Sequence, residues 1–589
     1  MLNYRLIDPP LNELTIDEIL KNRGIDDVTE YKNPTQKSEI PFSLLDNIYD
    51  AATMYIKHLK KGSKIAYIVD SDADGFTSSA ILIAYTKRLF PDLQYEPFIH
   101  EHKAHGLEDM IERLEDGDHD LIILPDAGSY DKEYMERLIL QNKEVIVLDH
   151  HAPLYDDDGN IHMYQGSSAV IVNNQLSEKY SNKSLCGAGV TYKFCQCLDE
   201  LFNVQYANDF IDLLSVGEVS DVMSQTYPET RYYIIEGLKH IKNRGLIGLI
   251  NAQSYTLQNK AEPPYRGLTP IDVAFRISPL INAITRVGTM LEKETLFNSL
   301  SIEEEVFVKS KKRGANDEMV SLADEAARMA TNARTRQNRI CEKSFELLDA
   351  RAHKNDLLEN KILFIPIEEE DEIPSELTGL IAQQFVSKYG RPCMLGRINP
   401  KEEWKGSIRS NENFRALPSF KKYLEESGYF DYVAGHASAA GFGINNSRVD
   451  KLIKKSNKDF TDKDFDPTPL ADAVINAKDN NLLSLGYSIA VDCENCFGNG
   501  VKEPTFVING IDLKDVLLMG KEKDSTKITC NGQVYVRFKD KSFADLAAAN
   551  KTAKINVYGR FSRNDFQGKT IVQFIIDNYE FEHRKKYEF

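Results

Sequence analysis

Cysteine, tryptophan and long apolar runs are scarce in this 589-residue chain. It has eight cysteines and one tryptophan, and no stretch approaches the roughly 18–20 apolar residues that a membrane-spanning helix needs. The first residues, MLNYRLIDPP, lack the basic start and apolar core of a signal peptide. So few cysteines argue against a secreted protein held together by disulfides. We therefore expect a cytoplasmic protein that does not enter a membrane.

Positive charge is also in deficit. The formal net charge of −18 argues against a generally basic surface for nucleic acid. It does not exclude nucleic acid, because binding depends on local patches and grooves rather than on the total charge. The 42% hydrophobic and 28% charged content is that of an ordinary globular protein, and the length predicts about three or four domains.

Three common motifs are absent or incomplete. The sequence has neither a G-x-S-x-G elbow nor a G-x-x-x-x-G-K-[ST] loop, and the segment GAGVTYK near Gly187 matches neither pattern. Nucleophilic catalysis by an elbow serine and use of a nucleoside triphosphate are therefore disfavoured. Cys493 and Cys496 form the only C-x-x-C pair, and without a second pair at zinc spacing they are a weak zinc signal.

Short apolar runs alternate with amphipathic helical patterns from Lys64 onward. The predicted strands are Ile65–Val69, Tyr95–Ile99, Leu121–Leu124, Val145–Leu148 and Ala169–Val172, with helices near Thr77–Phe90 and Asp131–Asn142. This βαβ rhythm predicts an α/β fold with a parallel, doubly wound sheet. Such sheets place their sites at the carboxyl ends of the strands.

The rest of the chain predicts further domains. Residues from about 303 to 359 are charged and contain no proline, which indicates a long connecting helix. The expected organisation is a leader (1–45), a parallel-sheet domain (46–300), the connecting helix (301–360), a smaller α/β domain (361–458), a linker (459–486) and a small antiparallel β-barrel (487–589).

The stretch VDSDADG, from Val69 to Gly75, places three aspartates at alternate positions. The pattern D-x-D-x-D-G also opens an EF-hand loop, which needs a helix before it and a glutamate at its twelfth position. Here an apolar, β-prone run precedes the aspartates and Ile81 occupies the twelfth position. The pattern therefore favours a site at the end of a strand over a calcium loop.

Three other stretches resemble this one in context. Asp126 in LIILPDAG, Asp149-His150-His151 in VIVLDHHAP and Asp221 in SVGEVSDVM each follow what reads as an apolar strand. An aspartate after a strand is commonly a helix cap or turn residue. Four such stretches in one predicted sheet, however, would bring carboxylates together at one edge. One or two divalent cations would relieve their repulsion, and carboxylates with imidazole suit Mn²⁺ or Mg²⁺.

These motifs, with VLDHH at their centre, resemble the DHH phosphoesterase superfamily and, within it, RecJ-like single-strand-specific exonucleases. VDSDADG, LPDAG, LDHH and GEVSDV match the family's metal motifs in order. FRISPLINAITRVG resembles its following segment, WKGSIRS and AGHASAAGFGI its DHH-associated domain, and CFGNGVKEPTF the start of its OB-fold. The likeness covers almost the whole chain, and it implies a metal-dependent exonuclease that degrades single-stranded DNA from the 5′ end in recombination, repair or replication.

The resemblance also implies roles for individual residues. Asp70 and Asp72 would hold one Mn²⁺ or Mg²⁺, Asp126 would bridge to a second, and Asp74, His150 and Asp221 would complete the second site. Asp149 would orient the first histidine, and His151 would face the scissile phosphate. The expected catalytic residues are thus His151, Asp149 and Asp126. The expected substrate-binding residues are Arg286, Ser407, Arg409, Gly435, His436, His100 and Lys103.

One segment departs from the family. Relatives usually carry an arginine after the second strand, whereas this chain has FIHEHKAHGL, with His100, His102, Lys103 and His105. The basic character survives, but the fork-shaped donor does not. Recognition of the 5′ end would then be weaker or would depend differently on pH, because histidine titrates near neutrality.

Two other functions stay open from the sequence. A DHH enzyme could act on short oligonucleotides or cyclic dinucleotides, but the long helix and terminal barrel argue for a longer substrate. A non-catalytic relative of the superfamily has lost its metal ligands, whereas this chain keeps them. The expected partners are single-stranded DNA, with a single-strand-binding protein or helicase, and the protein is expected to be a monomer in a bacterial or phage-infected cytoplasm.

Overall fold

A computed structural model of the chain describes residues 2–155, 160–265, 267–315, 317–411, 414, 416–465, 468–566 and 569–582. The chain divides into two units. Unit 1 comprises Met1–Thr285, Met290–Ala330 and Pro469–Phe589, and unit 2 comprises Arg286–Thr289 and Thr331–Thr468. Each unit is described by itself below.

Five buried strands of unit 1 form a parallel sheet in the order β3-β2-β4-β5-β6. They are β2 (Ile65–Val69), β3 (Tyr95–Ile99), β4 (Leu121–Pro125), β5 (Glu144–Asp149) and β6 (Ala169–Asn173), which confirms the predicted α/β class. The chain passes from β2 outward to β3 and then returns to β4 on the other side of β2. The strand order therefore reverses between β2 and β4, where doubly wound sheets bind their ligands.

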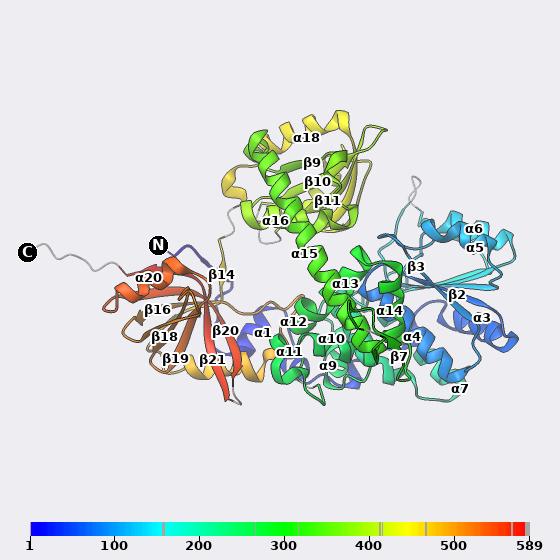
Figure 1. The fold of residues 1–589 in the computed structure, drawn as a ribbon, viewed down its shortest axis with the longest axis horizontal. Helices are drawn as coiled ribbons and strands as arrows, with labels where there is room; N and C mark the ends of the chain where they lie inside the picture. The colour runs from blue at the N-terminus through cyan, green and yellow to red at the C-terminus, as the bar shows by residue number, and fades with distance from the viewer. Residues whose placement is uncertain are drawn as a thin grey trace, which may run out of the picture. The chain divides into compact units, whose positions relative to one another are not determined.

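Helices cover both faces of this sheet. The helices α5 (Ile111–Asp116) and α6 (Lys132–Leu140) lie on one face, and α3 (Ile48–Lys61), α4 (Ala73–Leu89) and α7 (Gly187–Phe202) lie on the other (Figure 1). Because α4 is enclosed by the sheet and by other helices, all its residues from Ala73 to Thr86 are buried. The first turn of α4, which carries the aspartate-rich motif, is thus fixed by packing on every side.

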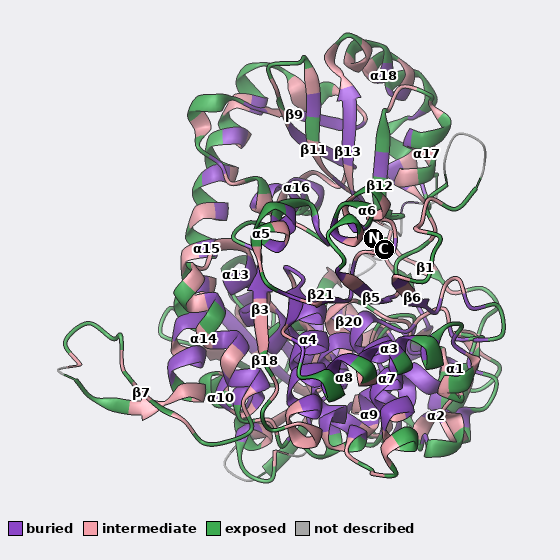
Figure 2. Cartoon of the chain, turned by 90° about the vertical axis from the view of Figure 1, so that its right-hand side faces the viewer, coloured by how far each residue is buried: buried purple, intermediate pink, exposed green. Residues whose placement is uncertain are grey.

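A second helical layer completes this half of unit 1. It includes α8 (Ile211–Ser220), α9 (Pro228–Lys239), α10 (Arg244–Ala252), α13 (Ser278–Val287) and α14 (Met290–Ser301). Figure 2 shows buried residues concentrated in α4, α7, α8 and α9. The interpretation of SVGEVS as a strand is wrong, because these residues belong to α8 and Asp221 is its C-cap. A helix buried on all sides is apolar all round, so its sequence resembles a buried strand.

The connecting helix is shorter than predicted. It is α15 (Leu322–Lys354), and a hairpin of β7 (Phe307–Lys309) and β8 (Met319–Ser321) precedes it. Gly314 lies in the left-handed region at φ 85°, which suits the turn between these strands. Part of the run from 303 to 359 is therefore extended, although its high content of charged residues and its lack of proline are typical of a helix.

Unit 2 contains a mixed sheet in the order β12-β13-β11-β10-β9. Its strands are β9 (Leu363–Ile367), β10 (Cys393–Ile398), β11 (Glu403–Arg409), β12 (Tyr432–His436) and β13 (Ala439–Asn445), and its helices include α16 (Thr378–Tyr389), α17 (Phe420–Glu426) and α18 (Asn446–Asp459). Trp404 is buried against Phe364 and Phe442 in the core of this unit. The sheet presents β11, with Ser407 and Arg409, between β10 and β13.

The C-terminal part of unit 1 is a seven-stranded sheet in the order β15-β16-β20-β21-β19-β18-β17. The strands are β15 (Ala473–Asn476), β16 (Phe506–Asp512), β17 (Val516–Met519), β18 (Ser525–Cys530), β19 (Gln533–Arg537), β20 (Lys554–Phe566) and β21 (Lys569–Phe581). The sheet is mixed rather than antiparallel, because β15 pairs in parallel with β16 and β19 with β21. Among the described strands, β15 and β17 are edges that do not pair to close the barrel.

The leader and the expected linker both belong to this C-terminal part. Strand β15 and helix α19 (Leu482–Tyr487) come from the segment 459–486. Helix α1 (Ile16–Asn22) buries Ile19 and Leu20 in one apolar cluster with residues of the sheet such as Phe506. The leader is therefore part of the hydrophobic core of the C-terminal sheet. Within the described residues, every helix is too short or too polar to cross a membrane.

This packing predicts that the leader stabilises the C-terminal sheet. Replacing Leu20, which is fully buried, by alanine should lower the free energy of unfolding by about 2–5 kcal/mol, because it leaves a cavity in the shared core. The matched change Leu483→Ala, at a side chain that is 47% exposed, should cost less than about 0.5 kcal/mol. Urea denaturation of both variants tests this, and equal midpoints would contradict the role of the leader.

Candidate metal centre

The aspartates after β2 are positioned by the start of α4. Asp72 is the N-cap, and its Oδ1 accepts hydrogen bonds from the backbone N–H groups of Asp74 (3.0 Å) and Gly75 (3.1 Å). A Cβ at Gly75 would lie 2.5 Å from Cβ of Asp70. The motif therefore needs glycine there, since a larger residue would push Asp70 away from the edge of the sheet.

The carboxylate of Asp74 is held by the N-terminus of α7. Its two oxygens accept hydrogen bonds from the backbone N–H groups of Gly187 (2.7 Å) and Ala188 (3.0 Å). Unpaired N–H groups and the helix dipole favour a negative charge at this position. The GAGVTYK segment, which matches no phosphate-binding loop, thus uses its helix N-terminus to bind a carboxylate of its own chain.

Asp126 follows β4 in a left-handed backbone conformation at φ 77°. Its backbone N–H donates to the carbonyl of Leu148 on the neighbouring strand at 2.7 Å, and its side chain is buried. A Cβ at Gly187 would lie 2.3 Å from Oδ1 of Asp126, so glycine is required for α7 to approach so closely. A left-handed aspartate costs about 1–3 kcal/mol, which the surrounding packing has to offset.

The expected metal ligands meet in three overlapping groups. Asp70, Asp72 and Asp126 form one group, Asp74, His150 and Asp221 another, and Asp126, His150 and His151 a third; in each, the donor atoms lie within 4.8 Å of one another. Nε2 of His150 is 3.2 Å from Oδ1 of Asp126, 3.5 Å from Oδ2 of Asp221 and 3.9 Å from Oδ2 of Asp74. Asp126 and His150 each belong to two of these groups, and the ligands of the three groups come from four separate segments of the chain.

The electrostatics of this centre fit a bound cation. Burial and the charges of Asp74 and Asp72 raise the pKa of Asp126 and the pKa of Asp221 well above the ordinary value for aspartate. Burial lowers the pKa of His150, which favours its neutral, metal-binding form. Within the described structure, one buried oxygen each of Asp70, Asp126 and Asp221 accepts no hydrogen bond. These carboxylate oxygens, together with the imidazole of His150, are the kinds of ligand that Mn²⁺ or Mg²⁺ binds.

Asp149 contacts the second histidine of the motif rather than the ring of the first. Its Oδ1 is 2.7 Å from Nδ1 of His151 and accepts from the backbone N–H of His150 at 2.7 Å, while Oδ2 accepts from the backbone N–H of Ser129 at 3.0 Å. Burial lowers the pKa of His151, but Asp149 outweighs this effect and raises it to about 10. The half-exposed ring of His151 is thus fixed through Nδ1, which leaves Nε2 for a substrate.

The histidine-rich segment after β3 differs from the expectation. His100 is buried rather than exposed, burial lowers its pKa, and neither ring nitrogen has a hydrogen-bond partner among the described residues. Its expected contact with a substrate stays a prediction. Lys103 is exposed, as a substrate contact requires. His105, which was not among the predicted site residues, lies with Nδ1 2.6 Å from Oδ2 of Asp70. Its ring is 6.4 Å from that of His151, so His105 belongs to the centre.

Unit 2 brings together a second group of predicted residues. Oγ of Ser407 is 2.8 Å from Oγ1 of Thr378, the first residue of α16. Burial and the charge of Arg286 lower the pKa of Arg409 to about 10, and among the described residues no carboxylate pairs with Arg409. A Cβ at Gly379 would lie 2.3 Å from Nη2 of Arg409, so the guanidinium packs directly against the start of α16. Two cations, a hydroxyl and a helix N-terminus are the groups that bind a phosphate.

Gly435 and His436 lie at the end of β12. Gly435 adopts φ 132°, and a Cβ there would lie 2.8 Å from the carbonyl oxygen of Ala439, so the β12–β13 hairpin itself requires glycine. His436 is exposed. Their expected role in binding substrate stays a prediction.

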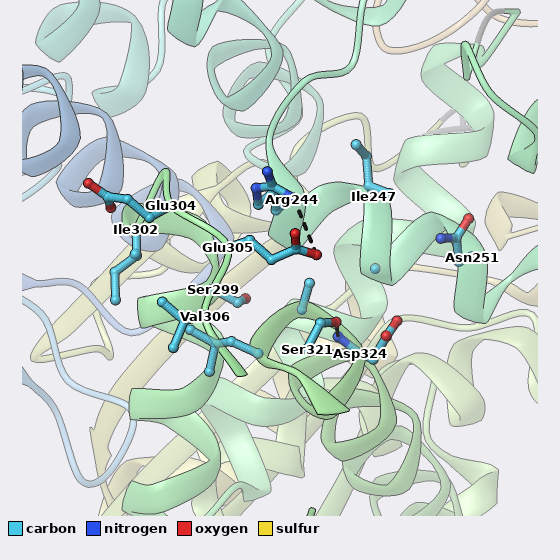
Figure 3. A pocket seen from close by; sticks show the side chains of 13 residues that line it. Arg244, Ile247, Asn251, Ser299, Ile302, Glu304, Glu305, Val306, Ser321 and Asp324 are labelled. Atoms are coloured by element: carbon cyan, nitrogen blue, oxygen red, sulfur yellow. Dashed lines mark hydrogen bonds and ion pairs between the residues drawn. The ribbon is translucent and has the colours of Figure 1, made fainter. Parts of the chain in front are cut away.

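A cavity of about 150 Å³ opens between α10, α14 and the start of α15 (Figure 3). Among the described residues, Arg244 is the only cation that lines it, and Nη1 of Arg244 is 3.7 Å from Oε1 of Glu305. The predicted site residues all lie outside its lining. With its cation paired, the cavity has no part in the metal centre.

Comparisons with known proteins agree with this geometry. The DHH family, N-terminal domain, matches residues 64–217, and the RecJ OB domain matches residues 488–578. The chain is 36% identical over 99% of its length to a protein of Bacillus subtilis named putative SPbeta prophage-derived single-strand DNA-specific exonuclease YorK, and it covers 98% of that protein. It is 26% identical over 68% of its length to the single-stranded-DNA-specific exonuclease RecJ of Thermus thermophilus, of which it covers 52%.

The fold agrees as well. The crystal structure of RecJ in complex with Mn²⁺ from Thermus thermophilus aligns with a TM-score of 0.69 and 21% identity, over 96% of this chain and 76% of that one. The match over residues 64–217 places the parallel sheet and its carboxylates in the class of DHH proteins. Within that class, the chain belongs to the RecJ family.

The raised pKa of Asp126 predicts a conflict between stability and metal binding. Without metal, the folded protein binds more protons than the unfolded chain at pH values above the ordinary aspartate pKa of about 3.9. Its free energy of unfolding should therefore fall as the pH rises from that value through the raised pKa. Asp126→Asn, which cannot ionise, should stabilise the metal-free protein at pH 7 by about 1–3 kcal/mol.

The same variant should lose its response to metal. Manganese at about 100 times its dissociation constant should stabilise the wild type by about 2.7 kcal/mol and the variant far less. Chemical denaturation in chelator and in Mn²⁺ measures both effects. Asp116→Asn, at an exposed aspartate of α5, is the control and should behave as the wild type. A less stable, metal-responsive Asp126→Asn protein would contradict the assignment.

Proposed function

We propose that this protein is a metal-dependent exonuclease that hydrolyses the phosphodiester bonds of single-stranded DNA from the 5′ end. The observation that carries the proposal is the convergence of Asp70, Asp72, Asp74, Asp126, His150 and Asp221 at the point where the strand order reverses. Relatives named single-strand DNA-specific exonucleases support the choice of substrate. The protein would act in a bacterial or phage-infected cytoplasm, with a single-strand-binding protein or helicase as a further partner.

Two groups of side chains would hold two divalent ions, Mn²⁺ or Mg²⁺. Asp70, Asp72 and Asp126 offer three carboxylates to one, and Asp74, His150 and Asp221 offer two carboxylates and an imidazole to the other. Asp126, which belongs to two groups, is the candidate bridge. When bound, such a pair of ions lowers the pKa of a water molecule and neutralises phosphate oxygens.

The chain's own residues would set the geometry of the reaction. Asp149 fixes the ring of His151 through Nδ1, so Nε2 can donate to an oxygen of the scissile phosphate or of the leaving group. The hydrogen bond between His105 and Asp70 orients one of the ligands, as groups around a metal site commonly do. Asp74 keeps its orientation because two backbone N–H groups of α7 bind it.

Unit 2 would supply the preference for the 5′ end. A terminal phosphate carries more charge and more free oxygens than an internal linkage. The guanidinium of Arg409, with Arg286, Ser407 and the N-terminus of α16, offers the planar fork, hydroxyl and N–H groups that such a phosphate accepts from. Mutual repulsion between the two arginines would be relieved by the same phosphate.

A digestion assay tests the activity and its substrate. Wild-type protein in Mn²⁺ should release nucleotides from end-labelled single strands and leave duplexes intact. Asp126→Ala should lower the rate by more than about 100-fold, because even residues that only orient metal ligands cost roughly 10- to 100-fold. Binding to DNA should persist. Faster hydrolysis of a dinucleotide than of a long strand would favour the alternative, a phosphodiesterase for short or cyclic substrates.

A second assay tests the end-binding residues. Arg409→Lys keeps the charge but loses the bidentate fork, so it should reduce the preference for 5′-phosphorylated over 5′-hydroxyl strands by roughly ten-fold, as expected for one charged hydrogen bond. Lys422→Ala, at a lysine side chain that is 73% exposed on α17, serves as the control. Competition between the two strand ends measures the preference. An unchanged ratio in Arg409→Lys would place the phosphate elsewhere.

A further inference from the structure

A cavity of about 370 Å³ lies beside Asp221. Four segments of unit 1 line it: the end of α8 with the following turn, Ile234 of α9, the π-helical turn η6 (Val273–Ile277) with the residues before it, and the turn at 498–503. Val219 and Val222, on either side of Asp221 in the sequence, are both part of its wall. The cavity thus begins one residue along the chain from a predicted metal ligand, and its volume is within the range of small-ligand sites.

The backbone turns sharply immediately after Asp221. Val222 lies in the left-handed region at φ 58°, which is a rare conformation for a β-branched residue. Its carbonyl accepts a hydrogen bond from Nδ2 of Asn499, which comes from the turn at 498–503. The side chain of Val222 is 59% exposed. A strained conformation held by a long-range hydrogen bond is typical of a functional position.

Another part of the wall displays an aromatic ring. In η6, Val273 and Ile277 are buried, whereas Phe275 between them is 72% exposed. A π-helical turn inserts one extra residue into a helix and often occurs at functional sites. Here the wider turn places an apolar ring beside the cavity instead of in the core.

The lining differs from that of the cavity in Figure 3, where polar and charged residues predominate around the Arg244–Glu305 pair. Around Asp221 the wall is mostly apolar, with Val219, Val222, Ile271 and Phe275. Two charged residues, Lys502 and Glu503, complete the wall, and Glu503 is 3.8 Å from Nε of Arg560. A mostly apolar wall with a few polar groups suits a flat, weakly polar group.

We infer that this cavity binds a nucleobase of the substrate, stacked on Phe275 beside Val222. The inference rests on the proposed function, because it takes the scissile phosphate to lie at the carboxylates. The base of a nucleotide next to that phosphate is attached within one sugar of it, and the cavity begins one residue from Asp221. Stacking on a phenylalanine accepts all four bases, as an exonuclease without sequence preference requires.

Strands with a single abasic site test this inference. The full-length protein is given 5′-phosphorylated single strands in which the base is missing at one of the first few positions. For the wild type, hydrolysis should slow by about ten-fold when the missing base is the one that occupies the cavity, in line with the loss of one stacking contact. Phe275→Ala should hydrolyse intact strands slowly and show no further loss at that position. Phe275→Trp should restore the sensitivity.

A second measurement does not depend on catalysis. A strand with 2-aminopurine at the sensitive position, bound in chelator, should lose fluorescence with the wild type through stacking and keep it with Phe275→Ala. The matched control is Phe307→Ala, which removes another exposed phenylalanine, on β7, outside this cavity. It should behave as the wild type in both assays. Thermal denaturation shows that each variant is folded.

The outcomes separate the two proposals. If the wild type degrades single strands but no abasic position slows it, the base site is wrong and the nuclease function stands. If Phe275→Ala keeps the wild-type sensitivity to the abasic site, the ring has a different role and the inference is overturned as well. If the wild type does not hydrolyse single strands in Mn²⁺, the proposed function itself fails, whatever the fluorescence shows.

Discussion

Mutual repulsion among buried carboxylates is the constraint around which unit 1 is built. Asp70, Asp74, Asp126 and Asp221 converge there, and burial with the neighbouring negative charges raises the pKa of Asp126 and of Asp221. Buried oxygens of Asp70, Asp126 and Asp221 lack hydrogen-bond donors in the described structure. Folding brings them together nevertheless, because each is fixed by an element that is stable for other reasons. A strand end fixes Asp70 and Asp126, a helix N-terminus binds Asp74, and a helix C-cap provides Asp221. The packing of these elements therefore offsets the electrostatic repulsion that arises when the site is assembled.

Much of this arrangement could be predicted from the sequence. Alternating strands and helices indicated the parallel sheet, and parallel strands deliver their last residues to one edge, so the convergence of Asp70, Asp126 and His150 followed. The predictions that failed concern features that depend on tertiary contacts. The run before Asp221 is apolar because α8 is buried on all sides. A short run that is apolar throughout does not distinguish a buried helix from a buried strand. Side-chain burial also separates the histidines after β3: His100, which was predicted to bind substrate, is buried, whereas His105 lies beside Asp70.

Two glycines are required at the site because other parts of the chain pack closely against them. Gly75 and Gly187 stand where a methyl group would collide with Asp70 and Asp126. Neither glycine could be distinguished from an ordinary helix-starting or turn glycine in the sequence, because the collision depends on how the chain folds around it. The GAGVTYK segment illustrates the consequence: its resemblance to a phosphate loop was rightly rejected, yet its N–H groups do bind an anion, the carboxylate of Asp74.

The two units present opposite electrostatic problems. Unit 1 gathers carboxylates, and unit 2 places the charge of Arg286 near Arg409, whose pKa it lowers. A ligand of opposite charge would reduce the repulsion within each cluster, and its binding would then stabilise the folded protein. Under the proposed function, an internal phosphodiester suits the metal centre of unit 1. A terminal phosphate, which carries more charge than an internal linkage, suits the arginines of unit 2.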